Sequence, residues 1–264
     1  MLKKWLNKVL SGRQSRQTEV RKEIIPAEEY RISADMISFA AEKTVKRLQE
    51  EGFKAYIVGG AVRDMLLGVD PKDFDVATDA TPEQVRKIFR RSRIIGRRFQ
   101  IVHVMTGPET IEVTTFRGGG KVQQNAHGRI MKDNTYGSIE EDAMRRDFTC
   151  NALYYDPIRE EILDFHNGVN DIAARSLVMI GDAAERYRED PVRILRAVRL
   201  SGKLGFSVEE STAAPIPEYA GHLKHEPVAR LFDEIMKLLF SGHARECLKK
   251  LNSLGVSDDI HPLL

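Results

Sequence analysis

The segment AYIVGGAVRDMLLG at 55–68, followed by KDFDVAT at 72–78, constrains the fold more than any other part of the chain. Its apolar start predicts a strand, Gly59-Gly60 ends that strand, and a helix then runs to a second strand that begins at Asp73. Backbone N–H groups at the start of such a helix attract anions. Gly59-Gly60 with Arg63 is therefore a candidate phosphate site, although a Gly-Gly pair alone is more often a tight turn.

Asp73 and Asp75 are the candidate metal ligands, because they lie two residues apart in the second predicted strand. Side chains alternate along a strand, so both carboxylates face one side while Phe74 faces the other. Mg²⁺ prefers oxygen ligands and usually keeps phosphates and waters in its remaining positions, which suits phosphoryl transfer. Two aspartates at a strand end are by themselves a common surface feature. The glycine turn upstream makes the functional interpretation the stronger one.

The residues around this segment predict a mixed sheet with helices over 27–160. A helix is expected at 33–51, and a capping box with proline at the first helical position opens another at Thr81. Strands rich in β-branched residues are expected at 98–106 and 109–117.

The pattern changes on either side of this unit. Residues 118–138 are polar and glycine-rich, which predicts a long loop, and 161–264 are expected to be all-α, so the fold class is α+β. Residues 1–26 begin with MLKKWLNKVL, in which apolar residues at helical spacing alternate with lysines. We expect this segment to be a basic, mobile tail that could touch RNA or an anionic membrane surface.

Composition limits the class of protein. With 264 residues, 42% of them hydrophobic, the chain can bury a core for two packed units. No apolar run reaches the roughly 18 residues that cross a bilayer. Cys150 and Cys247 have no metal-ligand spacing and form no disulfide framework. This cysteine usage favours an intracellular, reducing compartment, so we expect a cytoplasmic protein. We also expect a monomer, although no pattern in the sequence bears on the oligomeric state.

The formal net charge of +2 does not indicate a partner, but the basic residues are unevenly distributed. One cluster would give a local positive potential suited to phosphates, although any single member is usually just solvated. It consists of Arg86, Lys87, Arg90, Arg91, Arg93, Arg97 and Arg98.

The motif EDPVR at 189–193 predicts a helix with an arginine stripe. Asp190 fits the N-cap and the following proline fits the first helical position. Arg193, Arg196 and Arg199 then recur every three residues beside an apolar face. Such arginines pair with neighbouring acids as readily as they bind a ligand, so the pattern alone leaves both interpretations open.

Four ordered blocks resemble class II RNA nucleotidyltransferases, the family of bacterial poly(A) polymerases and of the CCA-adding enzymes of bacteria and eukaryotes. They are YIVGGAVRDMLLGVDPKDFDVAT at 56–78, EEDAMRRDFTCNAL at 140–153, LDFHNGVNDI at 163–172 and EDPVRILRAVR at 189–199. The resemblance covers nearly everything from about residue 30 onward. It implies a polymerase-β-like nucleotidyltransferase head, followed by an all-α neck and the start of a body at 161–264.

The resemblance also implies roles for single residues. Asp73 and Asp75 correspond to the metal-binding pair, which takes Mg²⁺ or Mn²⁺. Gly59, Gly60 and Arg63 correspond to the triphosphate contacts, with ATP as the substrate.

Further along the chain, Arg146 corresponds to a nucleotide-contacting arginine. Asp190 and Arg193 correspond to the pair that reads the base edge, and Arg196 and Arg199 continue the same nucleotide-binding helix.

The third active-site carboxylate has two candidates. Asp147 matches the acidic residue of the RRDFT motif and would complete the site according to the resemblance. On physical grounds Glu112 is its rival, because a neighbouring strand could carry it to the face of the aspartate pair. The sequence leaves this choice open.

The pattern IIGRRFQIVHV at 94–104 favours one branch of the family. Bacterial poly(A) polymerases carry G-R-R-F-x-x-x-H-V where CCA-adding enzymes usually have G-x-x-[FH]-G-T-V. The predicted function is therefore addition of AMP from ATP to RNA 3′ ends, with pyrophosphate released, and tRNA CCA addition is the alternative.

A non-catalytic RNA-binding module is a further alternative, against which the intact Asp73, Asp75 and Arg193 argue. Relatives continue past the equivalent of Leu264 with a basic RNA-binding part. The chain is therefore expected to lack that part and to bind RNA less tightly than they do.

Overall fold

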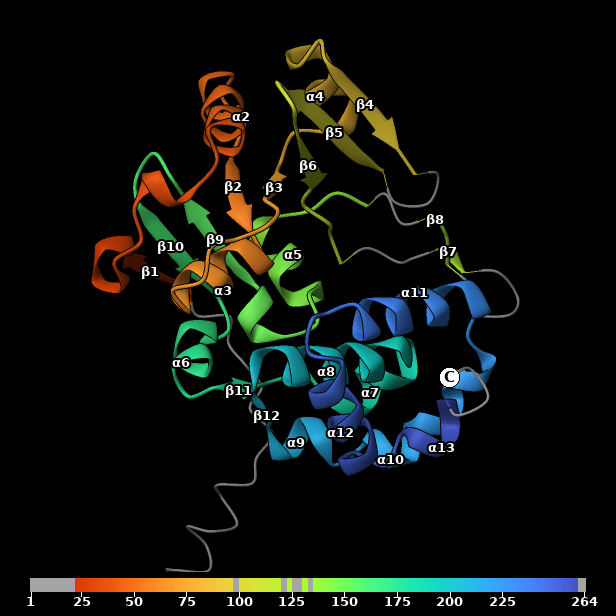
Figure 1. Ribbon diagram of the computed structural model, residues 1–264. Coiled ribbons are helices and arrows are strands. Elements are labelled where there is room, and N and C mark those ends of the chain that lie inside the picture. Colours follow the sequence, from red (N-terminus) through yellow and green to blue (C-terminus); the bar gives the residue numbers. More distant parts are fainter. Residues whose placement is uncertain (1–21, 97–99, 120–122, 125–129, 133–134, 261–264) are drawn as a thin grey trace, which may run out of the picture.

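The computed structural model describes residues 22–96, 100–119, 123–124, 130–132 and 135–260. Its largest element is an eight-stranded mixed sheet in the order β1-β10-β9-β2-β3-β6-β5-β4 (Figure 1). The strands of this sheet are β1 (Glu23–Pro26), β2 (Ala55–Val58), β3 (Asp75–Thr78), β4 (Ser92–Ile95), β5 (Ile101–Thr106), β6 (Glu109–Thr115), β9 (Leu153–Asp156) and β10 (Glu161–Asp164).

Helices cover both faces of the sheet. One face packs against α2 (Phe39–Glu50), α3 (Gly60–Leu66) and α4 (Pro82–Ile88) around Val76 and Val113. On the other face α5 (Ile139–Arg145) covers a smaller cluster that contains Val58, Phe116 and Tyr154. The two faces differ because side chains alternate along each strand. The short 3₁₀ turns are η1 (Ala27–Tyr30), η2 (Ala34–Met36), η3 (Thr149–Asn151) and η4 (Ala220–His225).

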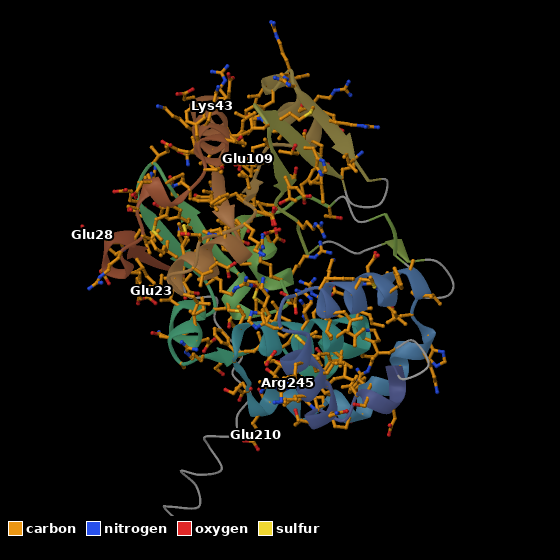
Figure 2. The ribbon with its side chains drawn as sticks, viewed as in Figure 1. Glu23, Glu28, Lys43, Glu109, Glu210 and Arg245 are labelled. Carbon is orange, nitrogen blue, oxygen red and sulfur yellow. The ribbon has the colours of Figure 1, made fainter. Side chains whose placement is uncertain are left out.

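Local signals fix where several helices start. The capping box at Thr81 is confirmed, since its Oγ1 accepts from Gln84 N while Gln84 Oε1 accepts from Thr81 N. Ser138 and Glu141 form a second capping box before α5. At the start of α2, Ser38 Oγ donates to Glu109 Oε1 at 2.6 Å, which ties this helix to β6 beside the labelled Glu109 (Figure 2).

The second half of the described chain is mainly helical and lies beside the α5 side of the sheet (Figure 1). Its longest helix, α8 (Val192–Leu204), packs against α11 (Val228–Leu239) and α12 (Ala244–Ser253). Gly202 permits this contact, since a Cβ there would lie 2.6 Å from Cys247 Cα. The remaining elements are α6 (Gly168–Ala173), α7 (Ala183–Glu189), α9 (Glu210–Ala213), α10 (Ile216–Tyr219) and α13 (Ser257–Ile260), with the short parallel pair β11 (Ser176–Leu177) and β12 (Ser207–Val208).

The α+β class is confirmed, but the edges of the sheet differ from the expectation. Glu23–Pro26 pairs with β10 as an edge strand, so the last four residues of the expected tail belong to the sheet. Residues 1–21 of that tail lie outside the described part. β10 itself falls at 161–164, so the sheet ends after Asp164 rather than at 160.

Smaller differences concern single elements. The helix expected at 33–51 begins at Phe39, after the cap at Ser38. Inside the expected loop at 118–138, β7 (Gln123–Gln124) pairs with β8 (Ile130–Lys132). Within the described part of the chain, no helix is long and apolar enough to cross a membrane.

Candidate active site

One row of paired residues crosses the sheet and passes through Asp75. In this row Asp75 pairs with Val58 of β2 on one side and with Glu112 of β6 on the other. Glu112 in turn pairs with His103 of β5, which pairs with Arg93 of β4. Paired residues of adjacent strands face the same side, so Asp75 and Glu112 share a face. Of the two candidates for the third carboxylate, Glu112 is the one that lies beside Asp75.

The row concentrates negative charge around Asp75. The pKa of Asp75 is raised to about 6, first by desolvation and then by the charges of Glu112 and Asp73, while the charge of Arg146 opposes this rise. Asp73 is exposed and lies two residues before β3, so only Asp75 is within the strand. His103 Nε2 lies 3.4 Å from Glu112 Oε1 on the side away from Asp75.

The glycine turn after β2 lies against two arginines. Gly59 has φ +72°, which disfavours other residues, and a Cβ there would lie 3.6 Å from Arg146 Nη1. A Cβ on Gly60 would lie 3.4 Å from Arg63 Nη2. Because Gly59 and Gly60 have no side chains, nothing at these two positions covers the guanidinium groups of Arg146 and Arg63. This arrangement is suited to an anion.

Arg63 is held in place by two partners. It is buried, its Nε and Nη2 donate to Asp64 Oδ1 at 2.9 and 2.6 Å, and its Nη1 donates to Asn151 Oδ1 at 2.6 Å. These bonds fix the guanidinium beside Gly60. Asn151 was not among the predicted site residues, and the signal that could have identified it is its place in the RRDFTCNAL motif.

Arg146 is fixed by the aromatic cluster under α5. Its Nη2 and Nε donate to Asp142 Oδ2 at 3.1 and 3.3 Å, and Nε also donates to Tyr154 Oη at 3.0 Å. Burial opposes the charge of Arg146, but Tyr154 and Asp142 raise its pKa above the usual range. Arg146 therefore stays charged beside Gly59 and Asp75.

Asp147 belongs to a different contact. It is buried and accepts from Arg196 Nε at 2.7 Å and from Phe148 N at 2.8 Å. Arg196 and these hydrogen bonds hold its pKa below the usual range, although burial alone would raise it. Since Arg196 is on α8, this ion pair joins the end of the α5 segment to the helical half.

The ends of α7 and α8 carry the proposed base-reading pair. α8 begins at Val192 with Pro191 at its N-cap, one residue later than expected, and Asp190 ends α7 instead. Asp190 Oδ1 nevertheless accepts from Val192 N at 3.3 Å, and both its oxygens accept from Arg230 Nη2 at 3.1 and 2.9 Å. Arg193 Nη1 donates to the Arg186 carbonyl at 2.7 Å and to Glu189 Oε2 at 3.1 Å.

The other arginines of α8 divide between two acids. Arg199 Nε donates to Glu234 Oε2 at 3.0 Å, and Arg196 Nη1 lies 3.7 Å from Glu234 Oε1. Glu234 is buried on α11, so the arginine stripe also holds helices together. No periodic pattern in the sequence predicts the contacts of Arg230 and Glu234.

The fold is that of a nucleotidyltransferase: its mixed sheet carries Asp75 and Glu112 beside a glycine turn lined by Arg63 and Arg146. Residues 55–178 match the family described as "Poly A polymerase head domain", and 205–264 match "Probable RNA and SrmB- binding site of polymerase A". The chain belongs to the class II RNA nucleotidyltransferase family, which comprises poly(A) polymerases and CCA-adding enzymes.

Individual relatives come from both branches of the family. Poly(A) polymerase I of Escherichia coli is 49% identical over 249 residues, which are 91% of this chain and 54% of that protein. The CCA-adding enzyme of Geobacillus kaustophilus is 39% identical over 212 residues, 80% of this chain and 52% of that protein. The chain thus spans about half the length of the curated relatives it matches.

Solved structures agree with the fold. The Bacillus stearothermophilus CCA-adding enzyme in complex with CTP aligns with a TM-score of 0.73 and 37% identity, over 82% of this chain and 52% of that one.

Proposed function

We propose that the chain transfers AMP from ATP to the 3′-hydroxyl of RNA without a template. The hydroxyl oxygen forms a bond to the α-phosphorus, the bond to the bridging oxygen of pyrophosphate breaks, and the hydroxyl proton is lost to a base or to water. The observation that carries this proposal is the position of Asp75, between Glu112 and the arginine-lined glycine turn.

The residues around Asp75 fit a hard divalent cation. Two carboxylates two residues apart offer oxygen ligands, and the negative charges that raise the pKa of Asp75 would be offset by a cation. Among the described residues no group of three or more acidic, histidine or cysteine side chains is placed to hold a metal ion. Mg²⁺ usually keeps substrate phosphates and waters among its ligands, and these would accompany the two carboxylates here. Mg²⁺ held by Asp73 and Asp75 would neutralise phosphate charge and ease proton loss from the RNA hydroxyl.

The chain's own residues supply the positioning. Arg63 and Arg146 bind the triphosphate at Gly59-Gly60, because hydrogen bonds from their partners orient both guanidinium groups. Glu112 is our choice for the third carboxylate, on the basis of its register with Asp75.

The helical half supplies selectivity in this proposal. Asp190 and Arg193 read the base, since a carboxylate and a guanidinium offer the acceptors and donors that match an adenine edge. Arg196 and Arg199 act on the nucleotide through the position of α8, because Asp147 and Glu234 already engage them.

Polyadenylation is preferred over CCA addition for two reasons. The G-R-R-F-x-x-x-H-V pattern is present, and relatives named poly(A) polymerase I are 46–49% identical, against 36–39% for those named CCA-adding enzyme. CCA addition remains the second candidate because the solved structure that aligns at 37% identity is a CCA-adding enzyme.

Primer extension separates these functions. A 5′-labelled oligo(A) and a tRNA lacking its CCA end are each incubated with Mg²⁺ and one nucleotide at a time. Long ladders with ATP alone, lost in Asp73→Ala/Asp75→Ala, are the expected result. Addition limited to C, C and A on the tRNA would establish the second candidate, and RNA binding without extension of either substrate would favour a non-catalytic module.

A further inference from the structure

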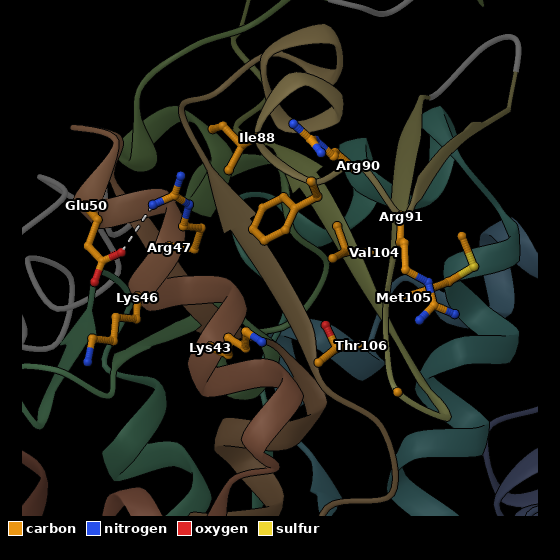
Figure 3. Close-up of a pocket in the computed structure, with 12 residues that line it drawn as sticks. Lys43, Lys46, Arg47, Glu50, Ile88, Arg90, Arg91, Val104, Met105 and Thr106 are labelled. Atoms are coloured by element: carbon orange, nitrogen blue, oxygen red, sulfur yellow. Dashed lines mark ion pairs between the residues drawn. The ribbon is translucent and has the colours of Figure 1, made fainter.

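A groove lined by described residues is separate from the site above. It has a volume of about 560 Å³ and lies between α2, the end of α4 and the end of β5. Its floor is apolar and includes Ile88, Phe89 and Val104. Figure 3 shows α2 with Lys43, Lys46 and Arg47 on one side of the groove, and Arg90 and Arg91 on the other.

The groove carries an excess of positive charge. Five cations line it, against the single acid Glu50. Arg47 is engaged, because it pairs with Glu50 at 3.6 Å and with Glu51 at 2.6 Å. In the described part of the chain Lys46, Arg90 and Arg91 are exposed and form no ion pair. Lys43 is also exposed and in no ion pair among the described residues, with its ammonium over the Phe39 ring. Four exposed cations without acidic partners around an open groove favour an anionic ligand.

The groove connects with the catalytic face around the edge of the sheet. Arg91 O accepts from Met105 N at 2.9 Å, just before β4 pairs with β5. Met105 and His103 lie two residues apart within β5 and so face one side of the sheet, and Arg91, which immediately precedes β4, is joined to Met105 by this hydrogen bond. That side is the face of Asp75, because Arg93 and His103 belong to its row.

The distance along this row is short. Asp75, Glu112, His103 and Arg93 lie on four adjacent strands, and three strand spacings amount to about 14 Å. A single RNA strand with its 3′ end at Asp75 could therefore pass over His103 and Arg93 with only a few nucleotides. Arg91 follows along the edge strand, and the groove lies beyond it, around the edge of the sheet on the α2 side.

We propose that Arg93, Arg91 and the groove between α2 and α4 form an RNA track, which binds the substrate strand upstream of its 3′ end. The cations contact phosphates, which supply most sequence-independent RNA affinity. The apolar floor accommodates base faces, which stack on such surfaces. An acidic protein segment would also match the charge, but RNA is favoured because the row leads from the groove to the catalytic carboxylates. The proposal rests on the proposed function, since it assumes an RNA 3′ end at Asp75.

The test compares RNA length in matched variants of this 264-residue chain. The track variant is Lys46→Gln/Arg90→Gln/Arg91→Gln. The control variant, Lys22→Gln/Arg159→Gln/Arg175→Gln, removes the same charge from exposed cations near the opposite edge of the sheet. Neither variant touches the site, so both should fold and extend a short primer.

Binding and extension are measured with oligo(A) of roughly three and roughly twenty nucleotides, over a range of salt concentrations. For the track variant we expect weaker binding of the long RNA only. The plot of the logarithm of its association constant against the logarithm of the salt concentration should have a slope shallower by about 2, because each of three lost phosphate contacts removes about 0.7. The control variant should match the wild type. Weaker binding of both RNAs, or unchanged binding of both, would overturn the track. Equally weakened binding in the control variant would show that net charge alone causes the effect. Failure of every variant, wild type included, to extend either RNA would instead count against the proposed function.

Discussion

The ion pair between Asp147 and Arg196 provides the sharpest test of how the two halves are joined. In Arg196→Met the aliphatic stem is largely kept, but Asp147 loses a partner that is 2.5 Å away from its carboxylate. The Asp147 side chain is only 10% exposed, whereas that of Arg196 is 36% exposed. Breaking a fully buried pair costs roughly 3–5 kcal/mol, and the exposure of Arg196 reduces this to about 2–3 kcal/mol.

The stability lost in Arg196→Met should depend on pH in a defined direction. In the wild type Arg196 holds the pKa of folded Asp147 below its ordinary value, so the pair stabilises the fold above the unfolded pKa of about 3.9. That contribution is lost as the pH falls through the lower, folded pKa. Without Arg196, burial raises the pKa of Asp147 instead. The difference between wild type and variant should therefore be largest near neutral pH and shrink toward pH 4–5.

Urea unfolding at neutral and at mildly acidic pH measures both effects. The matched control is Arg47→Met, whose ion pairs with Glu50 and Glu51 are half exposed and should contribute less than about 1 kcal/mol. If Arg196→Met lowered the free energy of unfolding no more than Arg47→Met at neutral pH, or lost more stability in acid, the assigned role of the pair would be wrong.

Three further predictions concern the site and the packing around it. Asp75→Asn should remove nucleotide transfer while leaving the thermal midpoint unchanged or higher, because it relieves like-charge repulsion; a clear fall in the midpoint would contradict this. Gly202→Ala should lower the free energy of unfolding in urea by about 1–3 kcal/mol, because the added Cβ would clash with the Cys247 backbone. An unchanged free energy would show that the two helices can move apart without loss. Arg230→Gln should change the free energy of unfolding by less than about 1 kcal/mol, because the pair is half exposed. The same variant should alter the preference for ATP over CTP, because it frees Asp190, and competitive extension with both nucleotides measures that preference. An unchanged preference would argue against base reading by Asp190.

Local pattern was enough to predict the elements that hold the site. The turn at Gly59-Gly60, the capping box at Thr81 and the start of α8 after Asp190 each depend on residues within one or two turns of chain. Such signals follow from backbone sterics and from hydrogen bonds between near neighbours, so the sequence contains them directly.

Contacts between distant residues were not predictable in the same way. The strand at Glu23–Pro26 was expected to be part of a tail, because four residues are too few to show a strand pattern in the sequence. Only its pairing with β10 makes the segment a strand. Asp147 was a candidate catalytic residue on the motif alone, and only the position of α8 pairs it with Arg196.

The sequence by itself determined the family, the glycine turn and the aspartate pair, since these depend on residue type and short spacing. Only the tertiary structure placed Glu112 beside Asp75 and Arg230 on Asp190. Both are contacts between residues some forty positions apart, and they are decided by strand register and helix packing. Register and packing are properties of the whole sheet and core, which no local period encodes.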